Sequence, residues 1–513
     1  MKIDVDVDTE ALSRRAAPIE IAPEEFRELG YRTVDLVADF LASLPEKPVN
    51  PGQGTREIRA RLGNRSLPER GAAPRDLLEE TARLLFDHSL FNGHPRFWGY
   101  ITSSAAPIGA LADLLASAVN PNVGAWDLSP MASEIEAQAV RWIAELIGYP
   151  SSCGGLFVSG GNMANFLGFL AARTAKVPWN VRELGLRNEA ARHLRVYVSS
   201  ETHTWIQKAA DQYGLGTKSI RWIPADSERR IDPQALRRQI QEDIDSGDLP
   251  FLVVGNAGTV STGAVDPLPE LSAICREHDL WLHVDGAYGA PAAAIPEASE
   301  DLKALSEADS VAIDPHKWLY APLEAGCVLV RNPKVLRDTF SYHPPYYTFD
   351  GEAEQAGTNY FEYGPQNSRG FRALKVWLAL RQVGREGYER MISDDIRLAR
   401  TLYELAQSEP ELEAFTHSLS ITTFRYVPAD LRSGSKEVEE YLNELNRTVL
   451  AQLQKSGEAY LSNAVIDGRF LLRACIVNFR TTLEDIENLP GLVTRIAKEV
   501  DPQIRPAELR AAS

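Results

Sequence analysis

Short apolar runs alternate regularly with segments of helical periodicity over more than 170 residues of this chain, and this alternation constrains the fold more than any other feature. The apolar runs are 156–158, 196–200, 219–223, 251–255, 280–284, 310–313 and 326–330, and helical spacing occupies 161–173, 204–213, 232–245 and 268–278 between them. Runs that are apolar on both faces predict strands buried between two layers of helices. We therefore expect an α/β fold with a mostly parallel sheet.

Two polar residues stand at the ends of such runs. Lys317 lies in the turn Asp314-Pro315-His316-Lys317-Trp318, and Asp285 ends the run that begins at Leu280. Ligands of open α/β sheets bind at the carboxyl ends of the strands. Either residue alone is more often a surface lysine or a helix-capping aspartate. Together they suit pyridoxal phosphate, whose aldehyde reacts with an amine and whose ring nitrogen needs an acidic partner.

Other strand ends carry further candidates for this site. The run 156–158 continues through Gly160 and Gly161 into a helix, and an exposed helix N-terminus behind glycines is an anion site that suits a phosphate. Many strand-to-helix turns contain two glycines, so this signal is weak alone. His203 follows the next run, and Asn256 and Thr259 follow the run 251–255.

Composition narrows the class of protein. The net charge of −17 argues against nucleic acid or an anionic membrane as the main partner. The four cysteines show no metal or disulfide spacing, and no apolar run approaches the roughly 18 residues that span a bilayer. The acidic N-terminus does not resemble a signal peptide. We expect a cytoplasmic protein without a metal, acting on a small molecule.

The chain divides into three predicted domains. Residues 1–106 contain amphipathic helices at 23–44 and 74–88, separated by a proline-rich loop, and form a segment too thin to bury itself. Residues 107–385 form the large domain with the sheet. Residues 386–513 contain amphipathic strands and helices, which predict a smaller α+β domain with one solvated face.

The motifs Pro315-His316-Lys317-Trp318 and His283-Val284-Asp285-Gly286-Ala287-Tyr288 resemble those of the group II pyridoxal-phosphate-dependent amino acid decarboxylases. The resemblance extends from about residue 26 to about 499 and is nearest the aromatic-L-amino-acid decarboxylase branch. It implies the type I, aspartate-aminotransferase-like fold with a seven-stranded sheet. It also implies a homodimer in which the N-terminal segment wraps around the other subunit. The implied reaction converts an L-amino acid, such as tryptophan, tyrosine or phenylalanine, to its amine and CO₂.

The resemblance assigns roles to individual residues. Lys317 would hold the cofactor aldehyde, Asp285 the ring nitrogen, and His203 would stack on the ring, while Tyr360 on a long loop would protonate Cα. Tyr346, Tyr347 and Tyr363 compete for the last role. The expected cofactor site comprises Lys317, Asp285, His203, Gly161, Asn162, Ala287, Asp314, His316 and Asn256, and the expected substrate site comprises Tyr100, Ile101, Ser103 and Trp126.

Alternatives stay open at this point. An oxygen-using aldehyde synthase, an aminotransferase or a decarboxylase of a non-aromatic amino acid would use the same apparatus. A pyridoxal-binding transcription regulator would need a basic DNA-binding segment, which the acidic N-terminus does not offer, and the intact catalytic set disfavours an inactive scaffold. Asn122 and Gly124 stand where the animal enzymes have bulky apolar residues, and Ile101 and Thr102 replace an aromatic residue and a proline. These departures predict a wider or more polar pocket.

Overall fold

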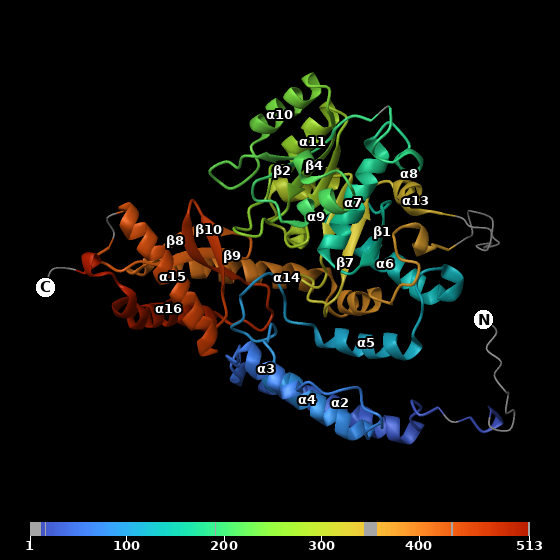
Figure 1. The fold of residues 1–513 in the computed structure, drawn as a ribbon, viewed down its shortest axis with the longest axis horizontal. Helices are drawn as coiled ribbons and strands as arrows, with labels where there is room; N and C mark the ends of the chain where they lie inside the picture. Colours follow the sequence, from blue (N-terminus) through green and yellow to red (C-terminus); the bar gives the residue numbers. More distant parts are fainter. Residues whose placement is uncertain (1–11, 16, 190, 343–356, 432–433, 511–513) are drawn as a thin grey trace. The chain divides into compact units, whose positions relative to one another are not determined.

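The computed structural model describes residues 12–15, 17–189, 191–342, 357–431 and 434–510. The chain separates into two compact units, residues 1–90 and residues 91–513 (Figure 1). The domain boundaries predicted at 106 and 385 therefore stay predictions, although the second unit contains the two expected sheets.

Within its described residues, the first unit contains the helices α2 (Pro23–Ser43), α3 (Thr55–Leu62) and α4 (Pro74–His88). The predicted helices at 23–44 and 74–88 are thus confirmed. Helices α2 and α4 pack through the stacked rings of Phe40 and Phe86, whose centroids lie 4.4 Å apart. Large apolar side chains remain exposed on this unit, including Phe26, Tyr31, Val34, Leu77, Leu78 and Leu85. The unit on its own buries little apolar surface.

The second unit is built around a seven-stranded sheet with the order β1-β7-β6-β5-β4-β2-β3. Its strands are β1 (Gly154–Val158), β2 (Leu194–Ser199), β3 (Ile220–Ile223), β4 (Leu249–Asn256), β5 (Trp281–Asp285), β6 (Ser310–Ile313) and β7 (Gly326–Val330). Neighbouring strands from β3 to β6 run parallel, and β7 is antiparallel to both β6 and β1. The predicted mostly parallel sheet is confirmed.

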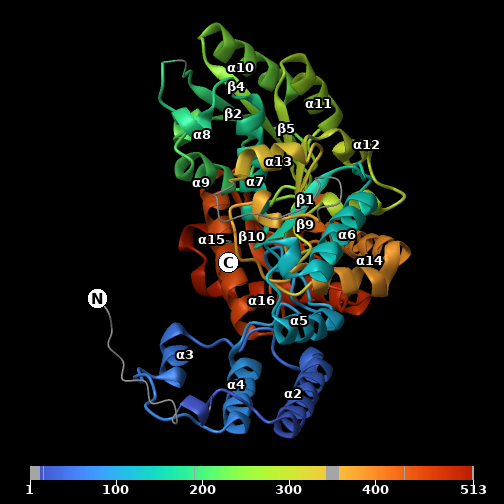
Figure 2. The same ribbon diagram turned by 90° about the vertical axis from the view of Figure 1, so that its right-hand side faces the viewer.

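Helices cover both faces of this sheet. They are α6 (Pro130–Leu146), α7 (Gly161–Lys176), α8 (Val181–Leu184), α9 (Trp205–Gln212), α10 (Pro233–Asp245), α11 (Leu268–Glu277), α12 (Glu300–Lys303) and α13 (Lys334–Phe340). Helix α5 (Pro107–Val119) packs instead against the later helix α14 (Ala373–Ser408). Successive residues of β4 point to opposite cores. Val253 packs with residues of α6, α10 and α11. Figure 2 shows α10 and α11 side by side at the top of the view. Leu252 and Val254 pack instead with α7, α9 and α13.

A four-stranded antiparallel sheet with the order β10-β11-β9-β8 forms the C-terminal part. Its elements are α14 (Ala373–Ser408), β8 (Leu412–Ser418), β9 (Ile421–Tyr426), α15 (Lys436–Ser456), β10 (Ser462–Ile466), β11 (Arg469–Cys475) and α16 (Leu483–Ile504). Helix α14 breaks at Gly384, where φ is 67°. A capping box between Thr482 and Asp485 starts α16. The expected α+β arrangement is confirmed, with strands β8 and β10 added to those predicted.

Candidate active site

The parallel strands bring the predicted polar residues to one edge of the sheet. Asp285 is the last residue of β5, Asp314 directly follows β6, and His203 follows β2 by a short turn. Because β6, β5, β4 and β2 are neighbours and run parallel, their carboxyl ends share this edge. Asn256, the last residue of β4, pairs in register with Asp285.

The lysine turn holds its amine beside a carboxylate. Lys317 Nζ lies 2.9 Å from Asp314 Oδ2, and the Lys317 N–H donates to the Asp314 carbonyl at 2.8 Å. The imidazole of His316 bonds the Ala325 carbonyl through Nδ1 at 2.8 Å. Burial by itself would lower the pKa of the Lys317 ammonium, but the carboxylates of Asp314 and Asp285 outweigh it, and the pKa is raised. The turn therefore keeps a paired, chargeable amine at the sheet edge.

Asp285 is held by two protein donors. The Trp205 indole N–H donates to Oδ2 at 2.8 Å, and the Ala287 backbone N–H donates to Oδ1 at 3.2 Å. Each carboxylate oxygen has a further lone pair with which to accept a ring N–H. Sequence reasoning missed Trp205, because a buried tryptophan at the start of a helix is ordinarily core packing.

The glycine turn between β1 and α7 forms a tight cradle. Gly160 has φ of 129° and caps α7 without a side-chain hydrogen bond. A Cβ on Gly161 would lie 2.6 Å from Asp314 Oδ2, and a Cβ on Gly326 would lie 2.5 Å from the backbone of Gly160. Only glycine fits this close approach, and the exposed Asn162 follows in the first turn. The uncapped N–H groups of α7 suit an anion.

His203 and Asn256 differ in how free their side chains are. His203 is exposed, and its Nδ1 accepts the Trp205 backbone N–H at 3.3 Å. Desolvation lowers the pKa of His203, with Asp285 partly opposing the change, so the imidazole is neutral near pH 7. The buried Asn256 amide instead donates to Thr202 Oγ1 at 3.1 Å and to Asp266 Oδ2 at 2.8 Å. The amide protons of Asn256 are therefore committed to the protein.

The predicted substrate residues divide into two groups. Ser103 Oγ donates to the His316 carbonyl at 3.0 Å, which ties the Tyr100–Ser103 segment to the lysine turn. Tyr100 is exposed, with φ of 55°. The Trp126 indole N–H instead donates to Glu134 at 2.8 Å, and no hydrogen bond or ion pair of the described residues joins it to Lys317.

Tyr360 lies in the core rather than on a loop over the site. Its side chain is 2% exposed, and the Arg369 guanidinium carbon lies 4.7 Å from the ring centroid. Burial raises the pKa of its hydroxyl well above the usual value of 10. The role of proton donor stays a prediction, and it would require Tyr360 to leave this position. Of the competing candidates, Tyr346 and Tyr347 fall outside the described residues, and Tyr363 is half-buried with its ring centroid 6.2 Å from that of Tyr360.

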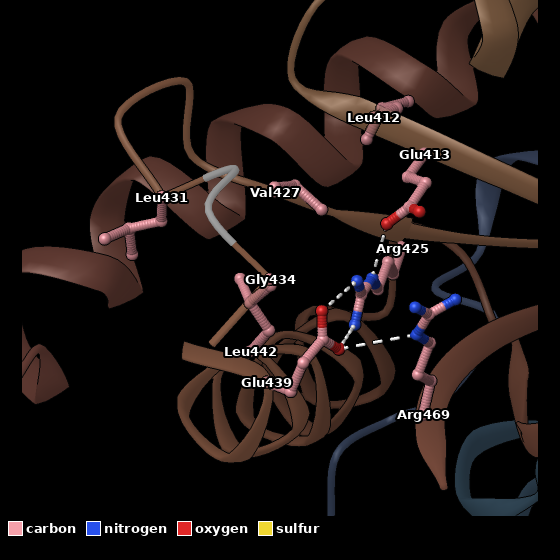
Figure 3. A pocket seen from close by; sticks show the side chains of 9 residues that line it. All are labelled: Leu412, Glu413, Arg425, Val427, Leu431, Gly434, Glu439, Leu442 and Arg469. Atoms are coloured by element: carbon pink, nitrogen blue, oxygen red, sulfur yellow. Dashed lines mark hydrogen bonds and ion pairs between the residues drawn. The ribbon is translucent and has the colours of Figure 1, made fainter. Parts of the chain in front are cut away.

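A separate cavity of about 320 Å³ lies in the C-terminal part. Figure 3 shows Arg425 between Glu413 and Glu439, with Arg469 facing Glu439 from the other side. Because these arginines are paired with glutamates, the described residues that line this cavity offer no amine or open carboxylate comparable to the Lys317 edge. Among the described residues, no group of three or more His, Cys, Asp or Glu side chains is placed to hold a metal ion. No helix in the described ranges is long and apolar enough to cross a bilayer.

Comparison with known proteins identifies the family. Residues 56–427 match the pyridoxal-dependent decarboxylase conserved domain. This chain belongs to the pyridoxal-dependent decarboxylase family. It is accordingly a carboxy-lyase that depends on pyridoxal phosphate, as its motifs predicted.

Individual relatives point to aromatic substrates. An aromatic-L-amino-acid decarboxylase of Bacillus atrophaeus is 36% identical over 94% of this chain and 97% of its own length. The tyrosine decarboxylase 4 of Petroselinum crispum is 30% identical over 91% of this chain and 92% of its own, and a phenylacetaldehyde synthase of a Rosa hybrid cultivar is 28% identical over 88% and 90%. The crystal structure of Oryza sativa TDC with PLP and tryptamine superposes with a TM-score of 0.87 and 26% identity, covering 94% of this chain and 99% of that one.

Proposed function

We propose that this protein converts an aromatic L-amino acid to its amine and CO₂, with Lys317, Asp285 and His203 as the central residues of the cofactor site. The observation that carries the proposal is the lysine turn, which places Nζ 2.9 Å from Asp314 Oδ2 on the same sheet edge as Asp285. The relatives named for aromatic amino acids support the substrate class.

The residues present fit pyridoxal phosphate. Lys317 offers an amine to the aldehyde, Asp285 a carboxylate to the ring nitrogen, and the turn into α7 offers unpaired N–H groups to the phosphate. The glycine cradle supports this fit, because any side chain at Gly161 would collide with Asp314. Asp314 is a poor phosphate ligand because its charge would repel the anion. We assign it instead to holding the lysine before the cofactor binds.

The protein groups divide the chemical work. When bound, pyridoxal phosphate supplies a ring that accepts the electron pair left at Cα as CO₂ departs. Asp285 keeps a proton on the ring nitrogen, which maintains the electron demand of the ring. His203, neutral at pH 7, offers a flat face and no competing positive charge. A proton must then reach Cα, from Tyr360 after a rearrangement or from Tyr346 or Tyr347.

A product assay tests the reaction. Purified protein with pyridoxal phosphate is incubated with tryptophan, tyrosine, phenylalanine and glutamate, and amine, aldehyde and CO₂ are each quantified. We expect CO₂ and amine in equal amounts from one or more aromatic substrates. Aldehyde with peroxide as the main product would instead favour the aldehyde synthase, a reading kept open by the phenylacetaldehyde synthase relative. Activity confined to glutamate would contradict the aromatic assignment.

We also infer a homodimer. Helix α5 exposes Leu111, Leu114, Leu115 and Val119, which recur at helical spacing and form an apolar stripe. An exposed apolar stripe of this kind marks an interaction surface. We expect a second copy of the chain to cover it. Light scattering should give twice the chain mass of 56.8 kDa, and Leu114→Glu should shift it toward the monomer. A wild-type protein that stays monomeric at micromolar concentration would contradict this inference.

We further place the protein in the cytoplasm. The four cysteines are free, and Cys275, Cys327 and Cys475 are buried, which suits a reducing compartment. Fractionation of the source cells, with the activity followed in each fraction, tests this location.

A further inference from the structure

We propose that Trp205 is a positioning residue of the cofactor site, in which the indole N–H fixes the carboxylate of Asp285 and the backbone N–H fixes the imidazole of His203. The proposal rests on the proposed function, because it takes Asp285 and His203 as groups that meet the cofactor.

The contacts of Trp205 reach both groups from one residue. Its indole Nε1–H donates to Asp285 Oδ2 at 2.8 Å, and its backbone N–H donates to His203 Nδ1 at 3.3 Å. The two acceptors belong to different strand ends, β5 and β2. Trp205 is the first residue of α9, where a backbone N–H has no partner inside the helix. One residue thus sets the spacing between two groups of the cofactor site. They are the carboxylate of Asp285, expected at the cofactor's ring nitrogen, and the imidazole of His203, expected on the ring face.

The indole itself is held rigidly. Trp205 is fully buried and packs edge-on against His283, with ring centroids 5.8 Å apart at 82°. His283 is fixed in turn by Ser310 Oγ at 2.7 Å and by Asn165 Oδ1 at 2.8 Å. Burial lowers the pKa of His283 to about 4, so this ring stays neutral over the working range of an enzyme. The support behind Trp205 therefore carries no charge that would change with pH.

The backbone contact also selects a tautomer. A nitrogen that accepts an N–H bears no proton in the neutral imidazole, so His203 carries its proton on Nε2. The Nε2–H is then the hydrogen-bond donor available on the open side of the ring. A tautomer fixed from behind is the usual way in which a protein orients a working histidine.

Trp205→Phe removes the indole N–H while keeping an aromatic ring against His283 and the backbone bond to His203. Trp377→Phe is the matched control, since the Trp377 indole N–H bonds the neutral Gln138 at 2.7 Å in a part-buried position away from the sheet edge. Hydrogen bonds to charged groups typically change equilibria by roughly 10- to 100-fold. We expect Trp205→Phe to bind pyridoxal phosphate about tenfold more weakly in titrations of the cofactor-free protein, and Trp377→Phe to bind as the wild type does.

A double-mutant cycle separates positioning from packing. If Trp205 acts through the carboxylate, Trp205→Phe should have little effect on cofactor affinity in an Asp285→Asn background. An equal tenfold loss in both backgrounds would overturn the proposal, as would unchanged affinity in the single variant. Wild-type protein that fails to bind pyridoxal phosphate at all would instead overturn the proposed function.

A spectroscopic test detects the hydrogen bond in protein that keeps Trp205. The chain has nine tryptophans, so indole ¹⁵N labelling gives a small set of N–H signals. The signal that disappears in Trp205→Phe is that of Trp205, and the signal that disappears in Trp377→Phe is that of the control. In the cofactor-free protein, Asp285→Asn should shift the Trp205 signal and leave the Trp377 signal unchanged. If Trp205→Phe does not fold, Asp285→Asn should still shift one buried indole signal. An unchanged set of indole signals in Asp285→Asn would contradict the hydrogen bond.

Discussion

Two ion pairs of the second unit use charge in opposite ways. The Lys317 side chain is 21% exposed and pairs with Asp314, whose Oδ1 has no hydrogen-bond partner within the described ranges. The Arg369 side chain is 1% exposed and pairs with the fully buried Glu136. Arg369 also donates to the carbonyls of Val123 at 2.8 Å and Phe157 at 2.7 Å.

The two ion pairs differ in whether a ligand could replace one of the partners. The Arg369–Glu136 pair joins β1, α6 and the loop around Val123, and the Phe157 N–H adds a bond to Glu136 at 2.9 Å. Replacing either residue of this pair would remove hydrogen bonds that hold these elements together. The Lys317–Asp314 pair has one main contact and an accessible side, so a ligand can replace the partner of the amine. Glu136 Oε2 and Arg369 Nε also lack a hydrogen-bond partner within the described ranges, but both side chains are buried. The reactivity of the Lys317–Asp314 pair therefore follows from its accessible side.

The largest expected effect is the loss of activity when the Lys317–Asp314 pair is changed. Lys317→Ala removes the amine that would bind the cofactor aldehyde, so activity should fall by at least roughly 10³-fold. The long-wavelength absorbance of lysine-bound cofactor should also disappear. Borohydride reduction followed by peptide mapping locates the attachment in the wild type. A reducible cofactor adduct on another lysine in Lys317→Ala would contradict the assignment.

Changing the Arg369–Glu136 pair should instead lower the stability of the fold. Arg369→Met leaves Glu136 as an uncompensated buried charge, which typically costs about 3–5 kcal/mol. Denaturant unfolding measures this loss. Lys334→Met is the control, because Lys334 pairs with Asp338 on the surface with a side-chain exposure of 74%, and it should change stability little. A loss in Arg369→Met no larger than in the control would show that the buried pair is not structural.

A neutral replacement at Asp285 should act on chemistry more than on stability. Asp285→Asn keeps the shape and removes the charge that holds a proton on the ring nitrogen. Losses near 10²-fold in kcat/KM, or about 3 kcal/mol, are typical when a preorganised charge is removed. Steady-state kinetics with saturating cofactor measure this, and thermal unfolding checks that the fold is kept. Turnover within a factor of two of the wild type would break the assignment.

The elements of the sheet follow from the sequence, because apolar runs at regular spacing have few other ways to fold. The direction of β7 does not, since a run such as Gly326–Val330 reads the same in parallel and antiparallel pairing. Lys317 and Asp285 could be predicted from the sequence because each is a charged residue at or just after the end of an apolar run. Trp205 is not visible, because its role depends on which strand end lies beside it, and only the fold supplies that neighbour.

Tyr360 shows a different limit of sequence reasoning. The region from Phe340 to Gln366 is rich in aromatic residues, proline and small polar residues, and such composition predicts a loop without indicating which aromatic residue is buried. Asn359 Oδ1 accepts the Trp126 backbone N–H at 3.0 Å, and the Phe361 N–H donates to the Gly124 carbonyl at 2.9 Å. These bonds on both sides of Tyr360 hold it against the core.

The smallest expected effect is therefore at Tyr360. In the buried position, Tyr360→Phe removes a hydroxyl from the core and should change stability by about 1 kcal/mol or less. If Tyr346 or Tyr347 supplies the proton, amine and CO₂ should still form in equal amounts, since loss of CO₂ itself requires only the ring, Asp285 and Lys317. If Tyr360 does move to protonate Cα, the variant should release CO₂ but make less amine, with aldehyde, ammonia and peroxide as the oxygen reaches the unprotonated carbon. Measuring amine and aldehyde in the same reaction decides between these outcomes. Tyr346→Phe and Tyr347→Phe are the companion variants, because one of them should show the aldehyde product if Tyr360→Phe does not.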